Sequence, residues 1–327
     1  MPSRLAASAQ MFTMAQSDVL PTNTLPVRVS RLLRIRGAGV ALPYVFVGPT
    51  VACLVVFGVL PIAVAAVVSL TNLDITGLGD HSAIRFVGLG NYRELFRDPA
   101  FWQALRNTAL YIGVGVPTLV VGSLSIAIAL NRSSSRFFRA LRVFYFFPAI
   151  TAIVAISLIW GYLYNSQFGL LNYLLSEVGL GPVQWLSDPT IAKFSVALVA
   201  IWRGSGLDII IFLAALQAIP TEYYEAASLD GASDRRQIFD ITIPLLKFAI
   251  FFVTVTTLIS WMQFFDEVYV LTQGGPVHST TSVSLYIYQE GFQYNAFGFA
   301  SAASIVLFAL IAVVTVVQLR LRRGRDD

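Results

Sequence analysis

Charged residues are scarce in this chain of 327 residues: Asp, Glu, Lys and Arg make up 12% of it, whereas hydrophobic residues make up 56%. That balance is too apolar for an ordinary globular domain and predicts an integral membrane protein. The net charge of +4 does not indicate nucleic-acid binding, because the basic residues lie at the ends of apolar segments rather than on a stripe interleaved with aromatics. We therefore expect contact with membrane lipid and none with nucleic acid.

Side chains that carry catalysis are also few. Cys53 is the single cysteine, which excludes an internal disulfide, and His81 and His278 are too few for a His/Cys metal site. A phosphate-binding loop needs Gly-Lys, but Lys193 and Lys247, the two lysines, do not follow glycine. No nucleophile with a base and no paired carboxylates occur on the apolar segments. The sequence thus predicts no enzyme, no catalytic residue, no metal and no bound cofactor; any ATP with its Mg²⁺ must be used by another polypeptide.

Long apolar runs are what the sequence does contain. An α-helix needs about 20 apolar residues to cross the hydrocarbon layer, and six segments qualify. They cover residues 37–73, 107–131, 143 to about 164, about 191–219, about 248–270 and about 297–318. We expect an all-α membrane protein with one six-span domain over residues 37–320. Residues 1–36 are predicted to be a flexible cytoplasmic tail, and residues 321–327 a second cytoplasmic tail.

The arginines predict the orientation, because basic loops stay on the cytoplasmic side. With the N-terminus inside, the inner segments hold Arg4, Arg28, Arg31, Arg34, Arg36, Arg132, Arg136, Arg139, Arg142, Arg235, Arg236, Lys247, Arg320, Arg322, Arg323 and Arg325. The outer segments hold Arg85, Arg93, Arg97 and, at a span edge, Lys193. Both termini and the loop 220–247 are therefore expected in the cytoplasm.

That loop holds the run EAASLDGASDRRQIFDITIPLL, which is unusually polar for a short connection between spans. Its composition predicts a short helix over residues 221–229, with Gly231 supplying a flexible or left-handed end. Ser233 is expected to cap a second helix, and Pro244 to kink the entry to span five. From the residues alone, a plain amphipathic connector on the inner leaflet remains an equal alternative.

The same run resembles the hallmark of permease subunits of binding-protein-dependent ABC importers: E-A-A, three residues, G, nine residues, I-x-L-P. The matching positions are Glu225, Ala226, Ala227, Gly231, Ile241 and Pro244, with Ile243 where Leu is usual. The fuller form, with Asp230, Gly231 and Ala232, is similar to the carbohydrate-uptake branch, which includes maltose and glycerol-phosphate permeases. FVGLGNYRELFRDPAFWQAL, FLAALQAIP and LTQGGPVHSTTSVSLYIYQEGF resemble the same family, so the likeness extends from about residue 40 onward.

This resemblance implies a type I importer permease of six transmembrane helices with a cytoplasmic coupling helix. It implies a multi-pass protein of a prokaryotic cell membrane that forms half of the path for a sugar, or a derivative such as glycerol phosphate. The implied partners are a second permease in a heterodimer, an ATPase dimer and an extracellular solute-binding protein. Residues 225–232 would dock into a cleft of the ATPase and carry its motion to the spans.

Polar residues within the spans are the candidates for the solute pathway, since ionisable groups in a membrane usually face a cavity or a partner. Asp208 is one of them, together with Arg203, Asp266 and Glu267. Asp266 and Glu267 could instead lie in the wet outer interface, and Arg203 and Asp208 could pair with each other or with a neighbouring subunit.

Resemblance adds Gly204, Leu207, Ser260, Trp261 and Phe264, which occupy positions that line the sugar site in maltose permeases of this family, although the side chains differ. The aromatic and polar mixture in SWMQFFDE suits sugars, which stack on aromatic faces. Ordinary packing of these aromatics is the alternative.

A secondary transporter driven by an ion gradient is the competing class. It would favour buried carboxylates in several spans and broken helices in inverted repeats. Intramembrane acids here are confined to spans four and five, which favours the importer permease.

Overall fold

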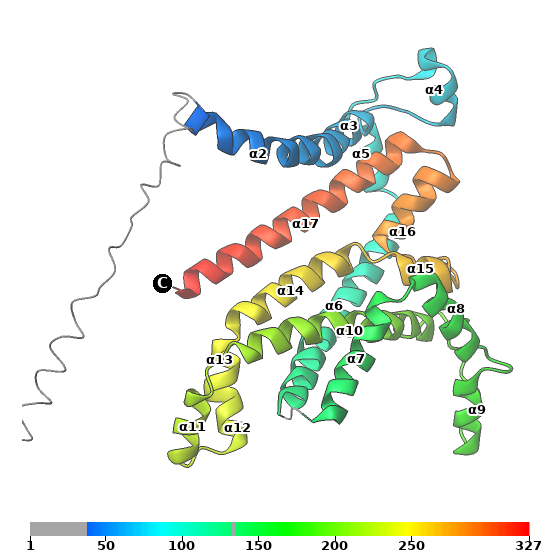
Figure 1. Ribbon diagram of the computed structural model, residues 1–327. Coiled ribbons are helices and arrows are strands. Elements are labelled where there is room, and N and C mark those ends of the chain that lie inside the picture. Colours follow the sequence, from blue (N-terminus) through cyan, green and yellow to red (C-terminus); the bar gives the residue numbers. More distant parts are fainter. Residues whose placement is uncertain (1–37, 133–134, 327) are drawn as a thin grey trace, which may run out of the picture. The chain divides into compact units, whose positions relative to one another are not determined.

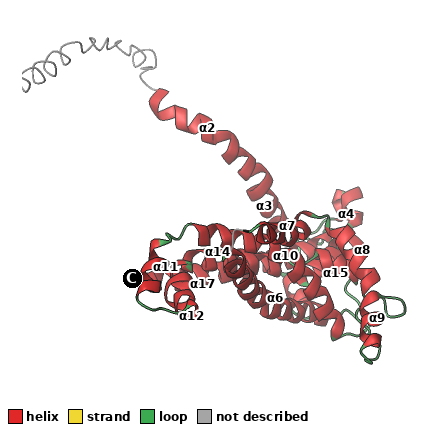
Figure 2. Ribbon diagram, turned by 60° about the horizontal axis from the view of Figure 1, so that its bottom comes forward, coloured by secondary structure: helices red, strands yellow, loops and turns green. Residues whose placement is uncertain are grey.

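The computed structural model describes residues 38–132 and 135–326, and apart from one isolated bridge between Thr71 and Phe86 their regular structure is helical (Figures 1 and 2). The predicted tail over residues 1–36 lies outside the described residues. The chain divides into two units, residues 1–60 and 61–327, which are treated separately.

Helices of the first unit carry no charge. α2 (Ala38–Leu54) continues into a π-helical turn, η2 (Val55–Val59), and α3 (Leu60–Val68) begins at the unit boundary. Residues Tyr44–Val68 are long and apolar enough to cross a membrane, as the first predicted span requires.

The second unit contains the remaining spans and their connections. Its long helices are α6 (Pro99–Asn131), α10 (Ile191–Gln217), α14 (Lys247–Met262) and α17 (Phe297–Asp326). The shorter elements are α4 (Ile75–Gly79), η3 (His81–Ala83), α5 (Gly90–Leu95), α7 (Arg136–Ile150), α8 (Ile153–Leu163), α9 (Leu170–Glu177), α11 (Glu222–Leu229), α12 (Asp234–Gln237), η4 (Ile238–Thr242), α13 (Ile243–Leu245), α15 (Asp266–Leu271), α16 (Val283–Tyr288) and η5 (Gln289–Gln293).

Within the described residues, five helical segments could cross a membrane, and a bent pair of helices would make a sixth. The bent pair covers the third predicted span, residues 143 to about 164. α7 and α8 meet at 101° after residue 150. Pro148, in the last turn of α7, has no N–H to donate to the Phe144 carbonyl, and past it the Thr151 hydroxyl donates to the Phe147 carbonyl at 2.8 Å.

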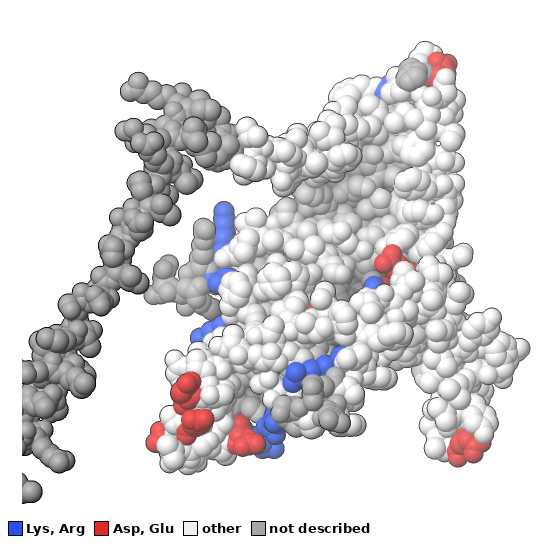
Figure 3. All heavy atoms as spheres, in the orientation of Figure 1, with Lys and Arg blue, Asp and Glu red and all other residues white. Residues whose placement is uncertain are grey.

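The core of this unit lies where α6, α10 and α14 pack side by side, which both ribbon views show. One cluster joins Tyr111, Val196 and Trp261, and a second joins Leu130 and Phe212 to residues of α14. Figure 3 shows a largely uncharged surface over these helices, with charged side chains gathered near α11 and α12. Helices in lipid present apolar side chains outward as well as inward, which explains the many exposed Phe, Leu and Val residues.

Glycine allows the closest of these helix contacts. The ring of Trp261 on α14 lies against Gly115 of α6, where a Cβ would overlap the indole. Gly206 of α10 lies in the same way against the Tyr145 carbonyl of α7. Small residues at such crossings let backbones approach, because dispersion contacts rather than water exclusion hold helices together in a bilayer.

Gly115→Ala should therefore destabilise the unit, by about 1–3 kcal/mol, because the added methyl displaces the Trp261 ring. Gly113→Ala on the same helix is the matched control, since nothing lies within 4 Å of a Cβ there. Thermal unfolding in one detergent compares the two variants. Equal midpoints would contradict the close contact.

Candidate functional site

The run that departs most from a plain loop forms a hairpin of two short helices, α11 and α12. Thr221 precedes α11, and Glu222 and Glu225 occupy its first turn, where carboxylates interact favourably with the helix dipole. The predicted helix over residues 221–229 is confirmed, with its start one residue later. We call residues 221–242 the α11–α12 hairpin.

Gly231 ends the first helix in the left-handed conformation that the sequence predicts, with φ of +78°. Its N–H donates to the Ser228 carbonyl at 3.1 Å, and the N–H of Ala232 donates to the Ala227 carbonyl at 2.8 Å. These two bonds form a Schellman cap, for which glycine is the favoured residue. Ser233 occupies the N-cap position of α12, as predicted, but its side chain makes no capping hydrogen bond.

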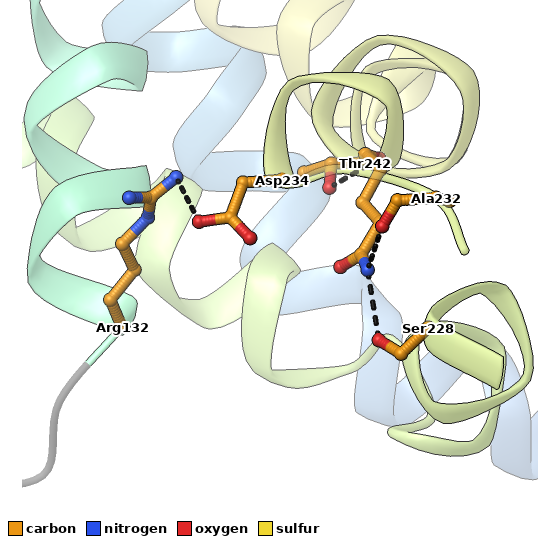
Figure 4. A network of polar contacts seen from close by, with 6 residues as sticks. Arg132, Ser228, Ala232, Asp234 and Thr242 are labelled. Carbon is orange, nitrogen blue, oxygen red and sulfur yellow. Dashed lines mark hydrogen bonds and ion pairs between the residues drawn. The ribbon is translucent and has the colours of Figure 1, made fainter.

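Polar contacts on the inner side of the hairpin brace its two helices (Figure 4). The Gln237 amide donates to the Ser228 hydroxyl at 3.0 Å and to the Ala232 carbonyl at 3.2 Å. The hydroxyls of Tyr224 and Thr242 lie 3.0 Å apart. Each contact joins α11 or the turn to the following helices, so hydrogen bonds hold the two arms of the hairpin together.

The hairpin is also tied to the end of α6. Arg132 and Asp234 form an ion pair at 3.6 Å, exposed on both sides and so of modest strength. A hollow of about 390 Å³ lies behind it, lined by Ile128, Asn131, Arg132, Leu216, Tyr224, Asp234, Gln237, Ile238 and Thr242. The sequence did not indicate the contacts that Arg132, Tyr224 and Gln237 make in the hairpin. These are ordinary polar residues, and their partners depend on how the turn folds.

The eight residues predicted for coupling separate into two groups by exposure. Glu225, Ala226, Asp230 and Gly231 are exposed, and Ala227 and Ala232 are half-buried beside them. Ile241 and Pro244 are half-buried farther along, where the hairpin joins span five. Leu229, at the tip, is 90% exposed, which leaves an apolar side chain uncovered among small residues.

Charged side chains within the spans are paired differently from the pairing considered in the sequence. Arg203 of α10 does not pair with Asp208; its Nε donates to Glu267 Oε1 of α15 at 2.8 Å. The Glu267 side chain is 2% exposed and that of Arg203 30% exposed. Asp208 instead accepts a hydrogen bond from the Thr257 hydroxyl of α14 at 3.3 Å. Both contacts join α10 to span five.

The other solute-pathway candidates lie on two sides of the same helices. Leu207 and Ser260 are exposed, and Gly204 is half-exposed. Trp261 and Phe264 are buried, with stacked rings 5.1 Å apart, and Phe264 meets Tyr111 edge-on at 4.9 Å. The two aromatics therefore pack in the core of this subunit, with the exposed positions beside them.

A second hollow, of about 460 Å³, lies at the end of the unit away from the hairpin and is lined by Asn72, Leu73, Asp74, Asn91, Glu94, Asp98, Glu290, Ala296 and Phe299. The Tyr286 hydroxyl donates to Asp98 at 2.5 Å. Burial, then the nearby Asp98 and Glu94 carboxylates, raise the pKa of the Glu290 carboxyl.

Comparison with known proteins identifies the class. Residues 102–326 match the family of binding-protein-dependent transport system inner membrane components. A lactose transport system permease, LacF of Rhizobium radiobacter, is 37% identical over 86% of this chain and 94% of its own length. The trehalose/maltose permease MalF of Thermococcus litoralis is 34% identical over 88% of this chain and 95% of its own.

A solved structure agrees with these relatives. A chain of the bacterial alginate ABC transporter, crystallised with its alginate pentasaccharide-bound periplasmic protein, superposes with a TM-score of 0.73 at 25% identity and covers 88% of this chain and 96% of its own. The present chain belongs to the binding-protein-dependent transport family of inner membrane components. It is a multi-pass inner-membrane permease of an ABC importer, it is no enzyme, and the ATPase lies in partner subunits. Permease subunits of these importers bind no cofactor of their own.

Replacing one member of the Arg203–Glu267 pair should cost more than replacing both. Arg203→Gln leaves a buried carboxylate without its partner, which costs about 3–5 kcal/mol. The double variant Arg203→Gln/Glu267→Gln keeps a neutral hydrogen bond and should recover most of that loss. A double-mutant cycle of thermal unfolding measures the coupling, and strict additivity would contradict the ion pair.

The free energy of unfolding should depend on pH through Glu290, which lines the second hollow. Because its pKa is raised, the folded state binds this proton more tightly than the unfolded state. Its stabilising contribution is present at low pH and is lost as pH rises above the ordinary value of 4.5 toward the raised one. Across that pH window, the midpoint temperature of thermal unfolding should fall less steeply with rising pH for Glu290→Gln than for the unchanged chain. Parallel curves would be the contrary result.

Proposed function

We propose that the α11–α12 hairpin is the surface through which an ATPase subunit drives this permease. The observation that carries the proposal is that the tip of the hairpin is exposed and built mostly of small side chains. Ala226, Asp230 and Gly231 are exposed on either side of Leu229, which is itself uncovered. A partner's cleft can approach such a backbone closely, and the Gln237 contacts keep the hairpin rigid enough to transmit a push. The arginine distribution supports a cytoplasmic position for the hairpin and both termini.

The chain is the permease subunit of an ATP-driven importer of sugars or sugar derivatives, the class of its relatives for lactose and for trehalose and maltose. Its assembly is proposed to contain a second permease, two ATPase subunits and an extracellular solute-binding protein. The alginate transporter offers a parallel, because its structure includes a periplasmic protein with bound saccharide. Membership of the family decides against an ion-gradient transporter.

The solute pathway is proposed to run along the shared face of α10 and α14, where Gly204, Leu207 and Ser260 are accessible. Asp208, Trp261 and Phe264 lie behind this face and shape it. They contact solute directly only if the helices shift during transport. Alternating access supplies such a shift: ATPase closure draws the hairpins together and opens the spans outward, and hydrolysis resets them inward.

Gly231→Asp should abolish ATP-dependent uptake while the chain still folds, because Asp tolerates a left-handed backbone but adds bulk and charge to the docking surface. Gly179→Asp is a matched control: Gly179 also caps a helix with positive φ, +76°, and an added Cβ meets nothing within 4 Å at either glycine. Uptake and ATPase co-purification are measured in the reconstituted complex.

Gly179→Asp should retain uptake and ATPase co-purification close to those of the unchanged complex. The coupling role fails if Gly231→Asp retains them too. It also fails if the two variants lose uptake equally, since backbone strain alone would then explain the loss.

A further inference from the structure

Four aromatic rings form two stacked pairs that meet edge-on at the end of span five, opposite the α11–α12 hairpin. We call Phe265, Tyr269, Tyr288 and Phe292 the aromatic platform. Phe265 and Tyr269 stack at 5.2 Å with planes 13° apart, and Tyr288 and Phe292 stack at 5.4 Å with planes 29° apart. Tyr288 joins the two pairs, meeting Phe265 edge-on at 5.3 Å and Tyr269 at 5.2 Å.

The platform differs from the neighbouring Trp261–Phe264 stack in its exposure. Trp261 and Phe264 are 5% and 6% exposed, whereas Phe292 is 71% exposed and the other three platform rings are partly exposed. Phe292 has one face against Tyr288, and most of the rest of its surface is open. Phe265, Tyr269 and Tyr288 also pack against the buried core cluster, so the open aromatic face of the platform belongs to Phe292.

Polar groups surround these rings. The hydroxyls of Tyr269 and Tyr288 lie 3.5 Å apart, the Gln289 amide donates to the Gln273 carbonyl at 3.4 Å, and Gln293 is exposed beside Phe292. Aromatic faces with adjacent amides and hydroxyls match a pyranose, whose C–H face is apolar and whose hydroxyls both donate and accept hydrogen bonds.

We propose that the aromatic platform is a sugar-contacting subsite, which holds a pyranose ring of the solute at the end of the spans opposite the hairpin. The proposal rests on the proposed function, the import of sugars. An aromatic belt facing lipid is a different arrangement, because belt residues spread around a bundle at one depth, whereas these rings stack on one another from two elements, span five and the α16–η5 segment.

The test is direct binding to the full chain in lipid nanodiscs. Phe292→4-fluorophenylalanine gives a ¹⁹F NMR signal at the open end of the platform, and Phe168→4-fluorophenylalanine, at a ring 67% exposed near α9, is the matched control. Lactose and maltose serve as pyranose probes and sorbitol as an acyclic polyol. We expect a saturable shift at position 292 with the two disaccharides, none with sorbitol and none at position 168.

Substitutions of Tyr288 distinguish stacking on an aromatic ring from contact with any apolar side chain. In the 292-labelled chain, Tyr288→Phe keeps the ring and should retain binding, whereas Tyr288→Leu should weaken it about three- to tenfold, the value of one aromatic contact. Identical responses to lactose, maltose and sorbitol, or equal affinity of the Phe and Leu variants, would overturn the subsite. Those results leave uptake by the complex and its sensitivity to Gly231→Asp unaffected, so a failure here is distinct from a failure of the proposed function.

Discussion

A charged side chain that this protein buries between its spans needs a partner within the protein, because the bilayer core offers no water. The contact between Arg203 and Glu267 is the clearest instance, since one of its two side chains is almost completely buried. It links the middle of α10 to the short helix that continues span five after the break at residues 263–265. The Asp208–Thr257 bond adds a second polar link between the same spans.

The same constraint governs helix packing. Apolar side chains gain little by leaving lipid for protein, so α6, α10 and α14 depend on close contact and on polar bonds. Gly115 under Trp261 and Gly206 beside the Tyr145 carbonyl allow that closeness. The result is a bundle braced through its middle, with the α11–α12 hairpin at one end and the exposed ring of Phe292 at the other.

The proposed coupling role depends on the rigidity of the α11–α12 hairpin. A push on an isolated flexible loop would be absorbed by backbone rotation. Here the Schellman cap at Gly231 sets the angle of the turn, and the Gln237 amide closes it. A force applied at the exposed tip can therefore reach η4 and α14, and from there the polar contacts with α10.

Local features of the chain were readable without a structure. Apolar runs of span length predicted six crossings, and the described residues contain five unbroken helices of that length and one bent pair. The composition of EAASLDGA predicted a helix with a flexible or left-handed end at Gly231, and the backbone there is left-handed. The break at Thr151 was not readable, because a proline near a helix end is compatible with a kinked span as well as with a turn of 101°. Ser233 was expected to cap a helix for its type alone, but its side chain makes no such bond.

The sequence by itself determined the membrane class, the apolar spans, the hairpin and the likeness to importer permeases, since these depend on composition and on neighbours a few residues apart. Only the tertiary structure decided that Arg203 pairs with Glu267, that Trp261 and Phe264 are core residues, and that Phe265 and Tyr288 meet edge-on. The physical reason is separation along the chain: those partners are brought together by helix crossing and rotation, which depend on many weak contacts at once.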